Sequence, residues 1–354
     1  MRGSWLKAAG DLNGDGRTDL VVGGAEGGGL VVYFNEYPQW RRELVDATRA
    51  FSTDGEVADM DGDGRNDIIA ITHKPSSVLW YQNTLDGWVV HSIVTNTWHD
   101  IEVADLDGDG LLDVVGRNQK EWPAGKDAGN KLYICWQRRE GTHVVWDQTT
   151  LDCPPGEGLL LADIARDGRR DIVINQRWYE NRGKRQWTEH VYAADTAWSH
   201  PNTFIAAGDI NGDGRRDLVL SPSELQGGRY KVSWFEAPAD PRSGPWTEHV
   251  IVTNVETVLH FVGAADFDGD GRVDVVTAHM TQGVDPDDVT LFLNRGSSRE
   301  GAWVDAWKPN VLSVDGSHSM RILDADGDGR PDLFGANWRA NKKDEHVKLW
   351  LNRL

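Results

Sequence analysis

The stretch Asp59-Met60-Asp61-Gly62-Asp63-Gly64-Arg65-Asn66-Asp67 places carboxylates at its first, third, fifth and ninth positions. Side chains on alternate residues, with a backbone carbonyl at position seven, can surround a hard cation such as Ca²⁺, and the glycine at position six allows the sharp turn. In an EF-hand two helices flank the loop, whereas here the apolar β-formers Ile68-Ile69-Ala70-Ile71 follow at once. The stretch therefore predicts a calcium loop that joins two strands of a β-hairpin.

The same pattern occurs seven times, with first aspartates that are 48, 46, 58, 46, 57 and 58 residues apart. The chain is therefore a repeat array, and seven copies in register argue against a chance set of solvated acidic turns. We predict that the loops bind calcium through side chains at positions one, three, five and nine and through the carbonyl at position seven. The predicted ligands are Asp11, Asn13, Asp15, Arg17, Asp19, Asp59, Asp61, Asp63, Arg65, Asp67, Asp105, Asp107, Asp109, Leu111, Asp113, Asp163, Asp167, Arg169, Asp171, Asp209, Asn211, Asp213, Arg215, Asp217, Asp266, Asp268, Asp270, Arg272, Asp274, Asp324, Asp326, Asp328, Arg330 and Asp332.

The fourth copy, residues 163–171, departs from this pattern. Ala165 stands at the third position, where a ligand is expected, and Arg166 stands where the neighbouring copies have glycine. Six or seven ions are therefore expected in all, with the fourth site the weakest or empty.

Each repeat predicts four short strands. One precedes the loop, one follows it, a third is aromatic, as in Leu79-Trp80-Tyr81, and a fourth carries Trp and often His, as in Trp187-Thr188-Glu189-His190. Four strands in about 50 residues are typical of a propeller blade. The sequence thus predicts an all-β fold with a single seven-bladed β-propeller domain over residues 1–354. Its last blade has three strands, because the chain reaches Leu354 after the third, so either the ring closes without an interlocking strand or the natural N-terminus has been trimmed.

Most of the 17 tryptophans are expected to fill the space between blades. His91, His190 and His249 share one position in the fourth strands and are expected to be structural in the same way. Cys135 lies in a predicted third strand and Cys153 in the following crossover, so either a disulfide or two reduced thiols is possible. If the hairpin turns at Glu140-Gly141, the strand register places the two cysteines poorly for a disulfide.

Charge and hydropathy narrow the classes of partner. The formal net charge is −19, and seven divalent ions would bring it to −5, so the acidity is mostly explained by metal ligation. The sequence has no basic stripe for nucleic acid, no apolar run of membrane-spanning length and no signal-peptide core at its start. Loops of this type usually need the calcium concentration found outside cells. We therefore expect the mature portion of a secreted, monomeric protein.

The stretch from Asp11 to Gly23, Asp-Leu-Asn-Gly-Asp-Gly-Arg-Thr-Asp-Leu-Val-Val-Gly, resembles the FG-GAP or VCBS-type repeat, and such repeats cover essentially the whole chain. The resemblance implies a seven-bladed, calcium-loaded β-propeller similar to integrin α-chain heads, bacterial adhesins, fungal lectins and several polysaccharide lyases. The Phe-Gly and Gly-Ala-Pro cassettes of the integrin repeats are poorly kept, and Phe334-Gly335-Ala336 comes nearest to them. The resemblance implies the fold well, but a fold of this kind carries many functions.

Candidate functional residues lie at the strand ends opposite the calcium loops, where the connections differ from blade to blade. Six residues before the first aspartates stand Trp5, Thr53, His99, Glu157, Thr203, His260 and His318, with His200 slightly earlier in the fifth copy. The loops between second and third strands should face the same side. They add His73, Arg117, Arg177, Glu224, His279, Asn337, Trp338 and Arg339.

Several functions fit this set. The first is carbohydrate binding, as in a lectin or adhesin, with ligand contacts from Trp338, Asn337, Arg177, Glu224, His200 and His73 and with Trp5, Trp98, Trp122 and Trp198 stacking on sugars. Protein adhesion is a further binding alternative.

The second is a polysaccharide lyase that acts on uronates. An imidazole would remove the proton α to the carboxylate, an arginine would neutralise that carboxylate, and a second His or Tyr230 would protonate the leaving oxygen. The candidate catalytic residues are His260, His279, His318, His99, Arg117 and Arg339. A glycosidase using Glu157 and Glu224 is a weaker variant. In a third class, His260, His279 and His318 bind a transition metal.

Overall fold

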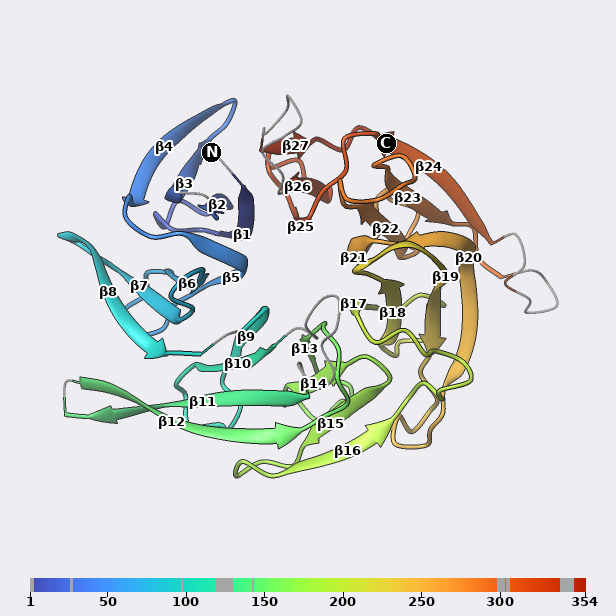
Figure 1. Ribbon diagram of the computed structural model, residues 1–354, viewed down its shortest axis with the longest axis horizontal. Helices are drawn as coiled ribbons and strands as arrows, with labels where there is room; N and C mark the ends of the chain where they lie inside the picture. The colour runs from blue at the N-terminus through green and yellow to red at the C-terminus, as the bar shows by residue number, and fades with distance from the viewer. Residues whose placement is uncertain are drawn as a thin grey trace. The chain divides into compact units, whose positions relative to one another are not determined.

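The computed structural model describes residues 3–25, 28–96, 98–118, 130–141, 143–297, 303, 306–337 and 347–354. These residues form 27 β-strands, and none of them lies in an α-helix. The strands make seven antiparallel sheets of consecutive strands, six with four strands and one with three (Figure 1). The fold class is therefore all-β, a seven-bladed β-propeller whose last blade has three strands, as predicted. No described segment is a helix long and apolar enough to cross a membrane.

The chain divides into two compact units, which are described separately. The first comprises Met1–Pro155 and Ser319–Leu351, and the second comprises Gly156–His318 and Asn352–Leu354. The prediction of a single domain over residues 1–354 stays a prediction.

The first unit holds blades one, two, three and seven. Their strands are β1 (Ser4–Gly10), β2 (Asp19–Gly24), β3 (Gly29–Glu36), β4 (Gln39–Asp46), β5 (Phe51–Ala58), β6 (Asp67–Thr72), β7 (Val78–Thr84), β8 (Gly87–Val94), β9 (Asp100–Ala104), β10 (Asp113–Arg117), β11 (Lys131–Glu140), β12 (His143–Asp152), β25 (Ser319–Leu323), β26 (Asp332–Ala336) and β27 (Lys348–Trp350).

The second unit holds blades four, five and six. Their strands are β13 (Leu160–Ala162), β14 (Asp171–Ile174), β15 (Arg177–Asn181), β16 (Trp187–Val191), β17 (Thr203–Gly208), β18 (Asp217–Pro222), β19 (Leu225–Glu236), β20 (Thr247–Thr257), β21 (Leu259–Ala265), β22 (Asp274–His279), β23 (Val289–Asn294) and β24 (Trp307–Ser313).

The second strand of each blade is buried on both faces, as β6 and β18 illustrate. These strands read as continuous apolar runs because apolar side chains from adjacent blades pack on each side of them. In the first unit, Leu6 and Val21 of blade one pack with Ile68 and Tyr81 of blade two. The fourth strands, such as β8, lie at the sheet edge and alternate more exposed with less exposed positions.

The predicted aspartate loops are the connections between first and second strands. In every blade the last residue of the first strand pairs with the ninth residue of the loop, as Ala58 does with Asp67 and Gly208 does with Asp217. The placement of the loops in β-hairpins is thereby confirmed.

A side-chain amide at the end of the third strand fastens a blade to the loop of the preceding one. In the first unit, Asn83 Nδ2 donates to the carbonyl of Leu12 at 2.8 Å, and in the second, Asn294 Nδ2 donates to the carbonyl of Ile210 at 2.9 Å. The same bond runs from Asn35 to Ala325, from Gln137 to Met60 and from Asn352 to Phe267. These amides satisfy loop carbonyls and lock neighbouring blades in register.

The recurrent outer-strand histidines are structural, as predicted. The rings of His91, His190 and His249 stack on the third-strand rings of Trp80, Trp178 and Trp234, with centroids 4.5, 4.4 and 4.3 Å apart. Each imidazole also reaches the residue two positions after that tryptophan, Gln82, Glu180 or Glu236.

Two tryptophans proposed above to stack on sugars lie in the core, so that prediction was wrong for them. Trp98 is 2% exposed and covers Gly116, where a Cβ would come within 2.1 Å of the indole. Trp198 is fully buried, and its Nε1 donates to Thr203 Oγ1 at 3.0 Å. Trp122 lies outside the described residues.

Cys135 and Cys153, both within the described residues, are reduced thiols. The hairpin of blade three does turn between Glu140 and His143, and Cys135 pairs with Gln148 in the ladder. Burial raises the pKa of the Cys135 thiol to about 12.

Candidate functional site

The aspartate loops share one hydrogen-bonding scheme. In blade two, the first aspartate, Asp59, accepts the N–H groups of Gly62 and Gly64, each at 2.8 Å. The ninth, Asp67, accepts the N–H of Met60 at 3.1 Å and that of Asn83 at 2.7 Å. These backbone donors hold the carboxylates of positions one and nine in place.

The third aspartate completes a cluster of carboxylates. In four loops, ligand oxygens from positions one, three and nine all lie within 4.8 Å of one another. These are Asp59, Asp61 and Asp67; Asp105, Asp107 and Asp113; Asp266, Asp268 and Asp274; and Asp324, Asp326 and Asp332. Like charges so close repel one another, and a divalent cation would remove that repulsion. Burial, together with Asp107 and Asp109, raises the pKa of Asp113 to about 7. These four loops fit a bound Ca²⁺.

Blades one and five have asparagine at the third position. The loops keep the same scheme, since Gly16 N–H donates to Asp11 and Gly214 N–H donates to Asp209, each at 2.8 Å. An asparagine Oδ1 is also an oxygen ligand for calcium. Asn13 and Asn211 therefore remain predicted ligands.

The loop of blade four does not fit an ion. Ala165 supplies no ligand oxygen, and its N–H shares Asp171 Oδ2 with the N–H of Ile164, both at 2.9 Å. Arg166 takes the left-handed backbone conformation, with φ at 58°, and donates to the carbonyl of Ala239 in blade five at 2.6 Å. This loop therefore lacks the predicted third ligand, and its fourth residue, which is glycine in the other loops, makes a contact to the next blade.

At the strand ends opposite the loops, blade six of the second unit presents a histidine cluster. His260 Nδ1 donates to the carbonyl of His318 at 2.6 Å, and the two rings stack with centroids 4.0 Å apart. The other nitrogen, Nε2, lies 2.9 Å from Glu224 Oε1. His260 and His318 are both buried.

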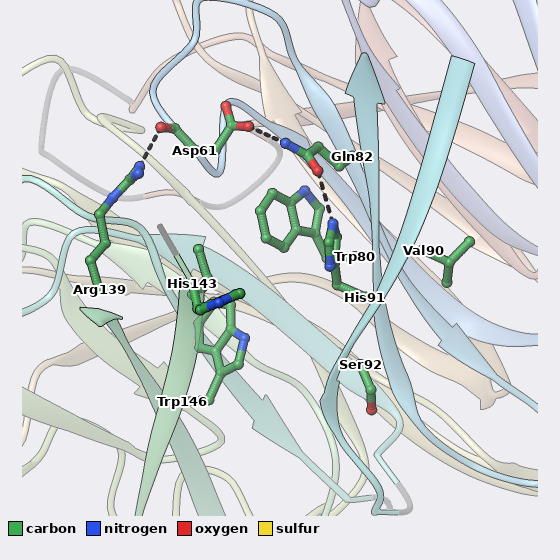
Figure 2. Close-up of a pocket in the computed structure, with 10 residues that line it drawn as sticks. Asp61, Trp80, Gln82, Val90, His91, Ser92, Arg139, His143 and Trp146 are labelled. Atoms are coloured by element: carbon green, nitrogen blue, oxygen red, sulfur yellow. Dashed lines mark hydrogen bonds between the residues drawn. The ribbon is translucent and has the colours of Figure 1, made fainter. Parts of the chain in front are cut away.

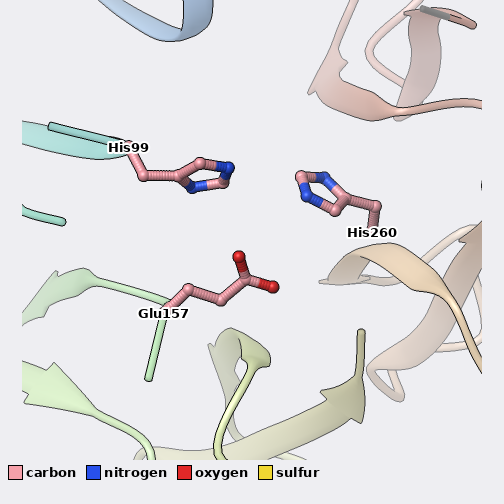
Figure 3. Close-up of side chains that lie close together, drawn as sticks. All are labelled: His99, Glu157 and His260. Atoms are coloured by element: carbon pink, nitrogen blue, oxygen red, sulfur yellow. The ribbon is translucent and has the colours of Figure 1, made fainter. Parts of the chain in front are cut away.

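Buried groups of blades four and five extend this cluster. Glu157 and His260 offer ligand atoms within 4.8 Å of each other, and Figure 3 shows their side chains directed toward one another. Glu157 Oε1 accepts a hydrogen bond from the Ser223 hydroxyl. His200 Nε2 donates to the carbonyl of Ser223 at 2.7 Å, and burial lowers the pKa of His200.

Two other residues of the second unit were predicted in loops but belong to strands. His279 ends β22, and Arg177 begins β15, where its Nε lies 3.5 Å from Glu189 Oε1. His279 is half-buried, and neither of its ring nitrogens has a hydrogen-bond partner among the described residues. Burial lowers the pKa of His279. The groups of the described residues that could hold a metal do not include the triad of His260, His279 and His318.

In the first unit, the predicted residues are spread over three blades. His99, also drawn in Figure 3, is buried, with Nδ1 3.0 Å from Asp100 Oδ1. Arg117 was predicted in a loop but ends β10, fully buried, and donates to the carbonyl of Pro154 at 2.7 Å. His73 lies against Trp5, with ring centroids 5.2 Å apart. Asn337 is half-buried, and Trp338 and Arg339 lie outside the described residues.

The predicted site residues thus fall into two groups. His99, Arg117, His200, His260 and His318 are buried. The half-buried group consists of His73, Arg177, Glu224, His279 and Asn337, but both ring nitrogens of His279, Arg177 Nε and Asn337 Oδ1 are themselves buried.

Sequence reasoning missed a network of charged side chains on the first strands of the first unit. Arg321 of β25 lies 2.6 Å from Asp54 Oδ1 and 3.7 Å from Glu56 Oε1 of β5. Lys7 of β1 is fully buried and donates to Ser319 Oγ at 3.0 Å. A recurrent offset could have revealed the network: Glu56, Glu102 and Arg321 each stand three residues before the first aspartate of a loop.

Burial shifts the titration of this network. It raises the pKa of Glu56 from its ordinary 4.5 to about 7, against the opposing effect of Arg321. Burial also raises the pKa of Glu102, and the negative charge of Glu56 raises it further. Burial lowers the pKa of Lys7. The network therefore makes the stability of the folded protein depend on pH.

We predict that Glu56→Gln reduces this dependence. A raised carboxyl pKa contributes stability that is complete below about pH 4.5 and is lost as the pH rises through about 7. The urea midpoint of the wild type, measured in excess calcium, should therefore fall relative to that of the variant between pH 5 and 8. Glu140→Gln, at the exposed last residue of β11, is the control. If the urea midpoints of the wild type and of Glu56→Gln changed in parallel with pH, the raised pKa of Glu56 would be contradicted.

The sheets and loops together define a class of protein: a seven-bladed β-propeller assembled from repeats that each carry an aspartate loop. The sequence profile of the FG-GAP-like repeat matches residues 59–116 and 266–335, which include the loops of blades two, three, six and seven. The chain therefore carries FG-GAP-like repeats. A search of curated proteins found no match.

Proposed function

We propose that the chain is a single-domain, calcium-binding extracellular β-propeller that binds a carbohydrate at the strand ends opposite its aspartate loops. The convergence of three carboxylates in each of four loops carries the calcium part of the proposal. FG-GAP propellers are typically extracellular, where calcium is abundant enough for exposed loops of this kind. A monomer secreted from the cell is the expected form.

Burial favours binding over catalysis at the histidine cluster. A general base must come within hydrogen-bond reach of the proton that it removes. His260 and His318 are buried, the Nδ1 of His260 donates to a backbone carbonyl, and its buried Nε2 lies 2.9 Å from Glu224 Oε1. The half-buried side chains remain as ligand contacts, and Trp338 and Arg339 remain candidates beside them.

One observation favours the lyase as the second candidate. Burial lowers the pKa of His279 and so favours the neutral imidazole, the form that can accept a proton, and its ring nitrogens, which are buried, have no hydrogen-bond partner among the described residues. In that mechanism Arg339 remains the predicted cation for the uronate carboxylate, because Arg117 is fully buried. Adhesion to a protein ligand is the remaining alternative.

A panel of acidic and neutral glycans, tested with the full chain in calcium, separates these functions. For a lectin we expect binding without turnover and a loss of at least tenfold in affinity for Trp338→Ala or His279→Ala, since a stacked ring or a charge-assisted hydrogen bond contributes about 1–3 kcal/mol. For a lyase we expect an unsaturated product that absorbs in the ultraviolet, absent in His279→Ala. Glu140→Gln is the control, and melting curves show that each variant is folded. If no glycan binds or is cleaved, the carbohydrate function is wrong and protein adhesion replaces it.

A further inference from the structure

A pocket of about 450 Å³ lies in the first unit, on the outer strands of blades two and three. We call it the outer pocket. Its volume falls in the range of small-molecule sites, about 300–1,000 Å³. The residues that matter for its chemistry are Asp61, Trp80, Gln82, His91, Arg139 and Trp146 (Figure 2). It lies beside the aspartate loop of blade two, and so is distinct from the strand ends considered above.

One wall of the outer pocket is a hydrogen-bonded chain that starts in that loop. Gln82 donates through Nε2 to Asp61 Oδ2, and its Oε1 lies 2.8 Å from His91 Nε2. The His91 ring in turn stacks on Trp80. Asp61 is the predicted third ligand of the loop, so the position of this wall depends on the loop.

This series of hydrogen bonds is continuous because residue 82 is a glutamine. In blades four and five the equivalent residues are Glu180 and Glu236, which accept from a histidine and pair with arginines. A carboxylate cannot donate to an aspartate, whereas an amide both donates and accepts. The link from loop to pocket is therefore particular to blade two among the three blades that share the Trp–His stack.

The opposite wall comes from β12 and the end of β11. His143 and Trp146 stand across the pocket from Trp80 and His91 (Figure 2). The indole of Trp146 is half-buried and offers an apolar surface of the kind on which sugar rings stack. Polar side chains that surround such a surface fix the orientation of a ligand.

Arg139 gives the outer pocket its charge. Its guanidinium donates to the backbone carbonyl of Asp61 and is exposed to solvent. A cation in the blade-two loop would neutralise Asp61, the acidic residue among those that line the pocket. The outer pocket would then carry the positive charge of Arg139, and a guanidinium binds a carboxylate in a bidentate manner.

We propose that the outer pocket binds a saccharide that carries a carboxylate, and that this binding is coupled to the cation in the loop of Asp61. The ring of the sugar stacks on Trp146, its carboxylate pairs with Arg139, and its hydroxyls bond to His91 and Gln82. The proposal rests on the calcium-binding part of the proposed function and is independent of the strand-end site.

D-Glucuronate and D-glucose are matched probes, because they differ only at the carboxylate. Titrations of the full chain in calcium, followed by tryptophan fluorescence and ligand-observed NMR, should give a Kd at least tenfold lower for D-glucuronate. Arg139→Met and Trp146→Ala should each raise that Kd at least tenfold. Arg138→Met is the matched control, since Arg138 is half-buried on the same strand, pairs with Glu140 and Asp147, and does not line the pocket. Acetate tests whether a carboxylate alone is sufficient.

Asp63→Ala tests the coupling. Asp63 is the predicted fifth ligand of the loop but does not line the pocket, so the substitution weakens cation binding and leaves the pocket side chains unchanged. We expect it, like EDTA, to raise the Kd for D-glucuronate at least tenfold. An unchanged Kd after the ion is lost would overturn the coupling. Equal affinity for D-glucose or acetate, no binding of D-glucuronate at millimolar concentration, or a loss of binding in His279→Ala but not in Arg139→Met would overturn the site.

Discussion

Removal of calcium with EDTA is expected to lower the melting temperature by at least about 10 °C. A ligand that binds only the folded state stabilises it by mass action, which amounts to about 2.7 kcal/mol for each site held at 100 times its Kd. Without ions, the clustered carboxylates of the loops repel one another. Calorimetry in calcium and in EDTA measures the shift, with excess Mg²⁺ as the control for nonspecific divalent effects.

Elemental analysis should find six calcium ions per chain. The loop of blade four is the exception, because Ala165 supplies no ligand and Asp171 Oδ2 already accepts two backbone N–H groups. An unchanged melting curve or fewer than five ions would contradict the calcium assignment. A seventh ion in the loop of blade four, seen by anomalous scattering, would contradict the interpretation of that loop.

The second large effect is expected at the ninth position of a loop. Asp274 is fully buried, and its two oxygens accept the N–H groups of Asn294 at 2.8 Å and Phe267 at 2.9 Å. Asp274→Ala leaves both donors buried without an acceptor, at about 1–3 kcal/mol each, and also removes a predicted calcium ligand. We therefore expect the free energy of unfolding to fall by about 2–6 kcal/mol even in EDTA.

Asp268→Ala in the same loop is the matched comparison. Asp268, at the third position, accepts no backbone N–H described here and pairs with the exposed Arg295 at 3.1 Å, so its loss should affect mainly the ion. Urea unfolding should show both variants destabilised in calcium, but only Asp274→Ala destabilised in EDTA. Equal stability of the two variants in EDTA would show that the ninth aspartate is purely a metal ligand.

Much of the fold could be predicted from the sequence because its signals are local. The ligand pattern of Asp59 to Asp67 occupies nine consecutive residues, and the apolar runs that follow it are strands whatever lies beside them. Repetition then fixed the number of blades and their strand order. The departure of the fourth loop was also visible, since Ala165 changes the ligand set directly.

The burial of the candidate site residues could not be predicted in the same way. An offset of six residues before a loop places His260 and His318 at equivalent strand ends, but it does not show that their rings stack or that Glu224 covers His260. Arg117 and His279 were predicted in loops because the sequence does not mark where the second strands end. Accessibility depends on side chains that approach from other blades.

Sequence alone determined the repeats, the hairpin loops and the all-β class, because each depends on residues within one blade. Tertiary structure decided what joins the blades: the amide of Asn35 reaches a carbonyl 290 residues away, and Arg321 meets Asp54 across 267 residues. The outer pocket is of this second kind, since Trp80 and Trp146 belong to different sheets. A contact between sheets depends on how their faces pack, and a periodic pattern specifies each face without specifying which side chains of the next blade it meets.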